Sequence, residues 1–278
     1  MAEGELDVQG RITGASNATL YVSVTLEGVA TGAVYKPISG EKPLWDFPTA
    51  TLGLRETASY ELSAHSGLNV VPPTVLREGP FGPGSVQLWL NAPTEDAPEP
   101  GIGLGGMPLA AEPVLGEPGA GVVDVVAPGA LRPGWLRVLE AEDSYGDPIV
   151  LAHADDEGLR RIALFDAVAN NTDRKGGHIL RAANGRIFGV DHGLTFNLDD
   201  KLRTVLWGWA GERLTEAETG LLERLVEELT GGELRGVLAD LLDDDEIDRT
   251  ARRAAQLLRR RRFPKPPGDW HAIPWPPF

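Results

Sequence analysis

The sequence predicts an α+β protein in which a small, β-rich N-terminal unit with one helix precedes a larger, mainly helical C-terminal unit. Apolar residues alternate with polar ones from Leu6 to about Val34, which is the period of strands, and they recur at helical spacing in four segments after residue 154. One further helix pattern, Leu52 to Ser66, falls in the first unit. A segment rich in Pro and Gly begins at Pro93, after the β-rich unit, and the length of the chain allows one large or two small domains.

In the first unit, the alternation up to Val34 predicts a β-meander whose first turn contains the small residues 14–19. The next strand ends at Lys36, because Pro37 cannot donate a hydrogen bond to a partner strand. After the helix, two further strands are predicted at Val70–Thr74 and Ser85–Leu90. These elements would form one sheet with a helix beside it.

The second unit opens with an insertion, residues 93–147, whose first part has no period and is expected to be flexible or loosely ordered. A short strand at Val122–Val126 and a loop over 128–147 follow. The remaining expectations are a helix with Asp155 or Asp156 as N-cap, a hairpin over 179–190, and helices at 215–230, 234–242 and 245–262. The tail, residues 263–278, contains six prolines, Trp270, Trp275 and Phe278, and should lie extended against this unit.

Composition excludes several classes of function. The net charge of −15 argues against a nucleic-acid binder, because contacts to phosphates need positive surface. There is no cysteine, so thiol chemistry and cysteine zinc sites are excluded, and a metal would be a hard one bound by oxygen. No apolar run reaches the roughly eighteen residues of a membrane span, and no signal peptide is indicated, so we expect a cytoplasmic protein.

Two aspartates stand out in the stretch 169–196. Asp173 lies among Asn, Thr and Gly residues that favour a loop, which would display its carboxylate, and His178 follows five positions later. Asp191 lies where the second strand of the hairpin ends and is followed by His192 and Gly193. Metal-assisted phosphoryl transfer needs this order: one carboxylate to orient an acceptor hydroxyl, a second group five residues on, and a strand-end aspartate for magnesium.

The segments Asn-Asn-Thr-Asp173-Arg-Lys-Gly-Gly-His and Val-Asp191-His-Gly-Leu-Thr-Phe resemble the catalytic and metal-binding loops of the phosphatidylinositol 3/4-kinase-like family. They are most similar to type II phosphatidylinositol 4-kinases and more loosely to HipA-type kinases, and the whole chain resembles an uncharacterised actinobacterial branch of that group. The resemblance implies a bilobal protein-kinase-like fold, the units 1–91 and 92–278 being its lobes. It also implies ATP as the bound nucleotide and Mg2+ as the metal.

The resemblance also implies a set of site residues. Asp173 would be the catalytic base, Arg174 or Lys175 would steady the transferring group, and Asp191 with His178 would hold magnesium. Lys36 would bind the phosphates and be held by Glu56, which we choose over Glu61 because in the family the Arg-Glu opening of this helix supplies the partner. Nucleotide contacts would come from the covering loop, at Ser16 and Asn17, and from the hinge, at Gln87, Leu88 and Leu90.

Other interpretations of the same residues stay open. A lone lysine such as Lys36 is usually an ordinary surface charge, and Trp207 and Trp209 are expected to pack in the core instead of stacking on an acceptor. Asp166 would brace the catalytic loop by accepting from its backbone amides. His178 replaces the usual metal-binding asparagine, and neutral imidazole is a poorer magnesium ligand than an oxygen.

At the level of function, a kinase acting on a small-molecule or protein hydroxyl is expected before one acting on lipid. The alternative is a nucleotide-binding pseudokinase that serves a protein partner as scaffold or sensor. Transfer of an adenylyl group is a third option, which would need only a reversed nucleotide.

Overall fold

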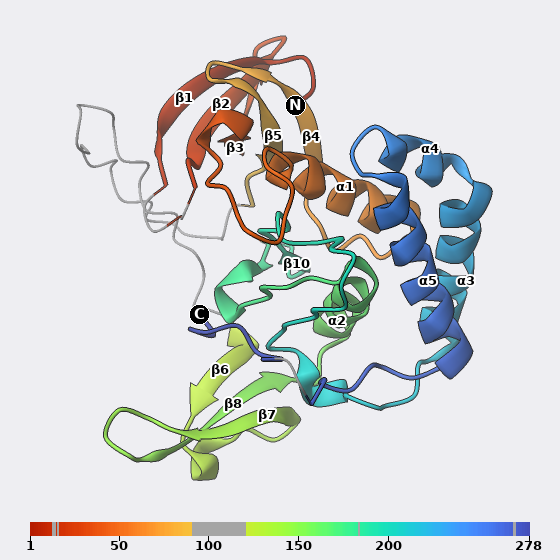
Figure 1. Cartoon of the computed structure of the whole chain (residues 1–278). Coiled ribbons are helices and arrows are strands. Elements are labelled where there is room, and N and C mark those ends of the chain that lie inside the picture. The colour runs from red at the N-terminus through yellow and green to blue at the C-terminus, as the bar shows by residue number, and fades with distance from the viewer. Residues whose placement is uncertain (13–14, 16, 91–120, 183, 269–270) are drawn as a thin grey trace.

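The computed structural model describes residues 1–12, 15, 17–90, 121–182, 184–268 and 271–278. Its N-terminal part is rich in β-structure and its C-terminal part is mainly helical, as the sequence predicts. The first part of the predicted insertion, like Ser16, lies outside the described residues. Figure 1 shows a five-stranded sheet at one end of the molecule, a three-stranded sheet at the other, and helices between and beside them.

The N-terminal sheet is antiparallel, in the order β1-β2-β3-β5-β4. Its strands are β1 (Glu5–Arg11), β2 (Leu20–Leu26), β3 (Val29–Pro37), β4 (Thr74–Gly79) and β5 (Gly82–Leu88). The buried side chains of β2 and β3 alternate along each strand, at Leu20, Val22, Val24, Ala33 and Tyr35, and join Val86 of β5 in a small apolar cluster. In β2 the predicted alternation is therefore the inward face of the sheet. In β3 it is not, because Val29 is 72% exposed and the buried residues are Ala33 and Tyr35 instead of Val34.

Helix α1 (Leu52–His65) follows the sheet's third strand and packs on β4 and β5. Its first two backbone N–H groups, at Leu52 and Gly53, donate to the carboxylate of Glu41 at 3.1 and 2.8 Å. An acceptor of negative charge at this end satisfies donors that lack a partner in the helix and suits the helix dipole. The start of α1 is thereby tied to the chain that leaves β3.

The second part begins with the antiparallel sheet β6-β8-β7. Its strands are β6 (Val123–Val126), β7 (Trp135–Glu142) and β8 (Pro148–Ala154). Helix α2 (Glu157–Ala169) follows, with Asp156 as its N-cap, and leads to the hairpin of β9 (Ile179–Arg181) and β10 (Ile187–Gly189). Both were predicted, because the cap residue and the Asn-Gly turn are local signals.

Three helices complete the chain: α3 (Glu216–Gly231), α4 (Glu233–Ala239) and α5 (Asp244–Arg260). The predicted capping box of Thr215 and Glu218 is present at the start of α3, with Thr215 N donating to Glu218 and Glu218 N donating to Thr215. Among the described residues no helix is long and apolar enough to cross a membrane.

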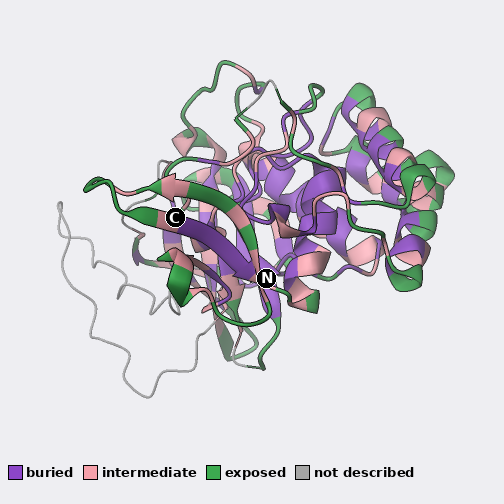
Figure 2. Ribbon diagram, turned by 90° about the horizontal axis from the view of Figure 1, so that it is seen from below, coloured by how far each residue is buried: buried purple, intermediate pink, exposed green. Residues whose placement is uncertain are grey.

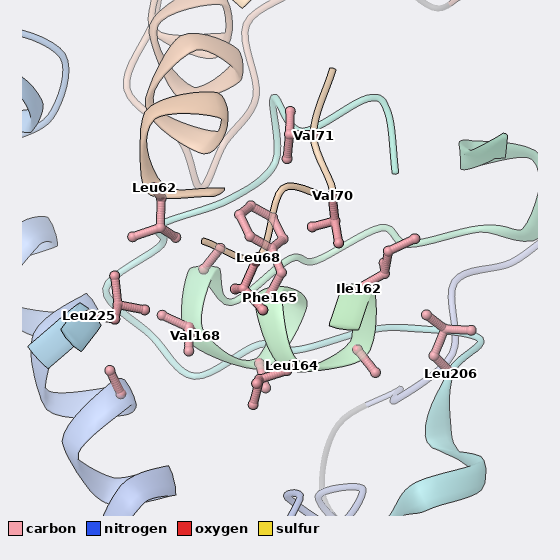
Figure 3. Close-up of a cluster of buried hydrophobic side chains, with 14 of the residues drawn as sticks. Leu62, Leu68, Val70, Val71, Ile162, Leu164, Phe165, Val168, Leu206 and Leu225 are labelled. Carbon is pink, nitrogen blue, oxygen red and sulfur yellow. The ribbon is translucent and has the colours of Figure 1, made fainter. Parts of the chain in front are cut away.

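The main core surrounds helix α2. Phe165, Ile162, Leu164 and Val168 of α2 are fully buried, and Figure 3 shows side chains of α1 and of the segment after it, among them Leu62 and Val70, around the ring of Phe165. Figure 2 shows the same division, with buried residues inside and exposed residues on the outer helix faces and strand ends. Because Ala58 and Leu62 belong to this cluster, α1 packs on both the N-terminal sheet and the C-terminal part.

Two predicted segments were wrong. Val70–Thr74 is not a strand: Val70 and Val71 are buried in the main core, and both backbone N–H groups donate to the hydroxyl of Ser63. The strand starts instead at Thr74. The loop expected over 128–147 contains β7, which pairs with β8 although its alternation is interrupted by an irregularity between Arg137 and Leu139.

The described part of the tail lies across the C-terminal part, as expected. The carbonyl of Ala272 accepts from Thr204 N at 3.0 Å and from the indole of Trp207 at 2.8 Å, and Pro277 O accepts from Gly176 N at 2.7 Å. A Cβ on Gly176 would lie 2.3 Å from the ring of Phe278, so only a glycine allows this approach. The indole contact also shows that Trp207 packs inside the molecule.

Candidate active site

Lys36 is one of the points at which the two parts of the molecule meet. It lies at the end of β3, and its ammonium nitrogen is 2.5 Å from Oε1 of Glu56 and 2.9 Å from Oδ1 of Asp191. Asp191 is 155 positions away in the chain. The structure therefore brings together the lysine, the helix glutamate and the strand-end aspartate that the sequence singled out.

Glu56 of helix α1 contacts both Lys36 and the loop that carries Asp191. Its side chain is only 3% exposed, and its second oxygen, Oε2, accepts from the backbone N–H of His192 at 3.0 Å. Glu61, the other candidate on this helix, lies near His65. One carboxylate thus binds Lys36 of β3 and the loop that carries Asp191.

The pKa values of Lys36 and Asp191 shift in the directions that keep both side chains ionised. Burial disfavours the charged form of Lys36, but the carboxylates of Asp191 and Glu56 outweigh it and raise the pKa of Lys36 above its ordinary value. The ammonium of Lys36 in turn lowers the pKa of Asp191 well below its ordinary range. Because the Asp191 side chain is 56% exposed, solvent screens this attraction. The site therefore presents a fixed cation beside an accessible anion.

Asp191 lies in a left-handed backbone conformation, with φ of 59°, two residues after the end of β10. This conformation is uncommon for a residue other than glycine and often marks a functional position. Its second oxygen is 3.4 Å from Nε2 of His178, which comes from the short helical turn η4 (Gly176–His178). Burial lowers the pKa of His178, so its imidazole is neutral at pH 7.

Asp191 fits a magnesium site better than His178 does. Magnesium in proteins commonly uses one or two carboxylates and completes its coordination with water and substrate phosphates. His178 has a buried Nδ1 with no hydrogen-bond partner, whereas a metal-binding histidine normally donates from its second nitrogen. Within the described residues no group of three or more His, Cys, Asp or Glu side chains could hold a metal by itself.

Asp173 is displayed by a tightly bonded loop. Its backbone N–H donates to Oδ1 of Asn171 at 3.0 Å, and Thr172 donates to Leu194 O from both its N–H and its hydroxyl. The Asp173 side chain is 25% exposed, and Lys175 Nζ lies 3.2 Å from its Oδ2. The backbone that carries this carboxylate is thus held by hydrogen bonds, and the carboxylate itself is partly open to solvent beside the ammonium of Lys175.

Arg174 does not lie where the sequence analysis expected it. Its side chain is fully buried and pairs with Asp166 of α2, so it cannot steady a group transferred at the surface of the site. Lys175, the alternative considered for that role, is the cation beside Asp173. Asp166 also differs from expectation, because its carboxylate accepts from the side chains of Arg174 and Asn171 and not from backbone amides.

The expected nucleotide contacts are only partly open. The Leu88 N–H donates to Pro73 O, so it is not free for an adenine base, and the Gln87 side chain is buried and donates to Thr74. Leu90 is half-buried at the end of the described N-terminal residues. Asn17 uses its side-chain oxygen to accept from Lys42 N at 3.0 Å. Of the predicted hinge residues, Leu90 stays the open candidate.

Sequence reasoning gave no role to His192, which follows Asp191. Its ring is fully buried, its Nε2 lies 2.6 Å from Nη2 of Arg174, and burial together with Arg174 lowers the pKa of His192 well below its ordinary value. A histidine beside a candidate metal ligand is ambiguous in sequence. Only its burial against Arg174 in the structure shows that its ring faces inward.

The chain was compared with known proteins. It is 46% identical over 282 residues to protein Rv2133c of Mycobacterium tuberculosis, an alignment that covers 100% of this chain and 94% of that protein. The chain belongs to the Rv2133c family. No family model matches it. The resemblance of its two loops to phosphatidylinositol 3/4-kinase-like proteins therefore stays a prediction for the Rv2133c family.

Among solved structures, the Helicobacter pylori proinflammatory kinase CtkA is similar to this member of the Rv2133c family over 92% of the present chain and 97% of CtkA. The TM-score is 0.37 and the sequence identity is 11%. This similarity is too low to indicate a function.

Proposed function

We propose that the protein is an ATP- and magnesium-dependent kinase that transfers the γ-phosphoryl group to a hydroxyl of a small molecule or protein. The observation that carries this proposal is the meeting of Lys36, Glu56 and Asp191, from a strand, a helix and a loop, beside the loop of Asp173. In kinases a strand lysine paired with a helix glutamate, a metal-binding aspartate and a displayed base have these roles. A bilobal kinase-like arrangement with lobes 1–91 and 92–278 is part of the proposal.

In this mechanism each residue has one task. Asp173 orients the acceptor hydroxyl and takes its proton, while the hydroxyl oxygen bonds to the γ-phosphorus and the bond to the β-phosphate oxygen breaks, releasing ADP. Lys36, held by Glu56, binds phosphate oxygens in place of its present partner Asp191. A magnesium ion held by Asp191, with His178 as a weaker second ligand, would neutralise charge on the phosphates. Lys175 stands beside Asp173 to pair with the transferring group.

One observation favours a second candidate. His178 lacks the supporting contact that a metal-binding histidine normally has, which would weaken metal binding. A protein with this defect would bind a nucleotide without transferring phosphate and would act as a scaffold or sensor for a protein partner.

The test uses purified protein, magnesium and ATP labelled on the γ-phosphate, with a soluble extract and liposomes as separate sources of acceptor. We expect labelled product from the extract, and we expect Asp173→Ala to abolish transfer while nucleotide binding is kept. Asp147→Ala is the control, because that aspartate lies in the exposed turn between β7 and β8.

Other outcomes separate the alternatives. Binding of ATP with no transfer to any acceptor would establish the scaffold. Label from the α-phosphate on the product would establish adenylyl transfer, and product only with liposomes would establish a lipid acceptor. A protein that binds no nucleotide would refute all of these functions.

A further inference from the structure

The side chain of Arg174 contacts three separate segments of the chain. It follows Asp173 directly, is fully buried, and donates two parallel hydrogen bonds of 2.9 Å to the carboxylate of Asp166 in α2. Its Nη1 donates to His178 O at 3.2 Å and to Val190 O at 2.8 Å. One guanidinium thus binds both helix α2 and the backbone on either side of the β9–β10 hairpin. This hairpin joins the loop of Asp173 to the loop of Asp191.

The same guanidinium also reaches the loop of Asp191. Its Nη2 lies 2.6 Å from Nε2 of His192. Arginine has no acceptor atom, so His192 must accept at Nε2 and carry its proton on Nδ1. The backbone N–H of His192 then donates to Glu56, which holds Lys36. A continuous line of contacts therefore runs from Asp166 through Arg174, His192 and Glu56 to Lys36.

Space around the guanidinium is restricted in a way that keeps this arrangement. A Cβ on Gly189 would lie 2.9 Å from Nη2 of Arg174 and 3.1 Å from its Cζ, so β10 can pass this side chain only with glycine at that position. A buried ion pair such as Asp166–Arg174 is weak evidence for stability, because the cost of removing two charges from water offsets their attraction. The five directed hydrogen bonds of the Arg174 side chain instead fix the relative positions of the segments that it contacts.

We propose that Asp166, Arg174 and His192 form a positioning unit that fixes the distance and orientation between Asp173 and Asp191. This inference rests on the proposed function and deepens it, because it explains how the base and the metal ligand are held in register. The three residues act through the two aspartates and contact no substrate themselves. A displacement of about 1 Å in a catalytic group can lower turnover about a hundredfold, so loss of the unit should appear in turnover.

The test measures magnesium-dependent ATP turnover and urea unfolding for variants of the full chain. The pair is replaced as a whole, Asp166→Leu with Arg174→Met, so that no unpaired charge is left in the interior. We expect a folded protein whose kcat is about a hundredfold lower and whose half-saturating magnesium concentration is raised. Arg160→Met is the control: that arginine also lies in α2 and pairs with Glu218, and its loss should affect unfolding without lowering kcat.

A second variant keeps the inference testable if the double replacement does not fold. His192→Phe keeps the ring shape and the backbone contact to Glu56 but removes the acceptor for Arg174, and should lower kcat about tenfold. Adding His192→Phe to the double variant should lower kcat no further, because residues that act as one unit are not additive.

The outcomes distinguish the two proposals. In nitrogen NMR spectra of the wild type, His192 should show its proton on Nδ1, and this signature should be lost in the double variant Asp166→Leu with Arg174→Met. An active wild type whose folded variants keep kcat within threefold would overturn the positioning unit and leave the kinase intact. A wild type that turns over no ATP in the presence of either the soluble extract or the liposomes would refute the proposed function, and the positioning unit with it.

Discussion

The carboxylate of Glu56 gives the sharpest test of how the two parts of the molecule are joined. In Glu56→Gln the shape is kept, but the charge that binds Lys36 is removed from a side chain that is only 3% exposed. Breaking a buried ion pair costs about 3–5 kcal/mol when the other charge is left alone. Here Lys36 keeps Asp191 at 2.9 Å, and the glutamine oxygen can still accept from His192 N.

The expected loss is therefore smaller, about 2 kcal/mol, the range of a hydrogen bond to a charged group. For a chain of this size that lowers the melting temperature by about 4–8 °C. Urea unfolding at pH 7 and calorimetry measure both quantities. Glu61→Gln, five residues on in the same helix and half-buried beside His65, is the matched control and should change stability by less than about 0.5 kcal/mol.

Unfolding of Glu56→Gln and Glu61→Gln at the same urea concentration would contradict this prediction. That result would mean that Lys36 and Asp191 hold the loop without the helix. It would also remove the link on which the proposed phosphate-binding lysine depends.

Three further predictions concern the rest of the chain. Burial lowers the pKa of His153, whose Nδ1 donates to Ala154 O and whose Nε2 accepts from Gly208 N, so the unfolded chain binds its proton more readily. The contribution of His153 to stability should be fully present above about pH 6.5 and fall below that pH by up to about 1.4 kcal/mol per pH unit, and urea unfolding should find a flatter dependence on pH in His153→Gln. Gly176→Ala should displace Phe278 and speed hydrogen exchange at the Thr204 amide, which donates to Ala272 O, whereas Gly177→Ala, with open space at its Cβ, should not. Gly189→Ala should cost about 1–3 kcal/mol by crowding Arg174, and equal unfolding midpoints for wild type and variant would contradict this packing.

Local signals in the sequence determined the elements that depend on neighbouring residues. The N-cap at Asp156, the capping box of Thr215 and Glu218, and the hairpin turn at Gly185 are all present, because each is specified within a few positions. The alternation along β2 likewise predicted its inward face, since the side-chain period of a strand is fixed. The sequence also singled out Lys36, Glu56 and Asp191, whose contact the tertiary structure then showed.

Only the tertiary structure decided what depends on distant contacts. Val70 and Val71 have the composition of a strand, but Ser63 takes their backbone donors and the main core takes their side chains. Arg174 looks like a surface cation in sequence and becomes the most bonded interior charge of the loop, because Asp166 and His192 meet it from segments 8 and 18 positions away. The physical reason is that periodicity reports which face of an element is apolar, whereas the partner of a polar group is set by how those elements pack.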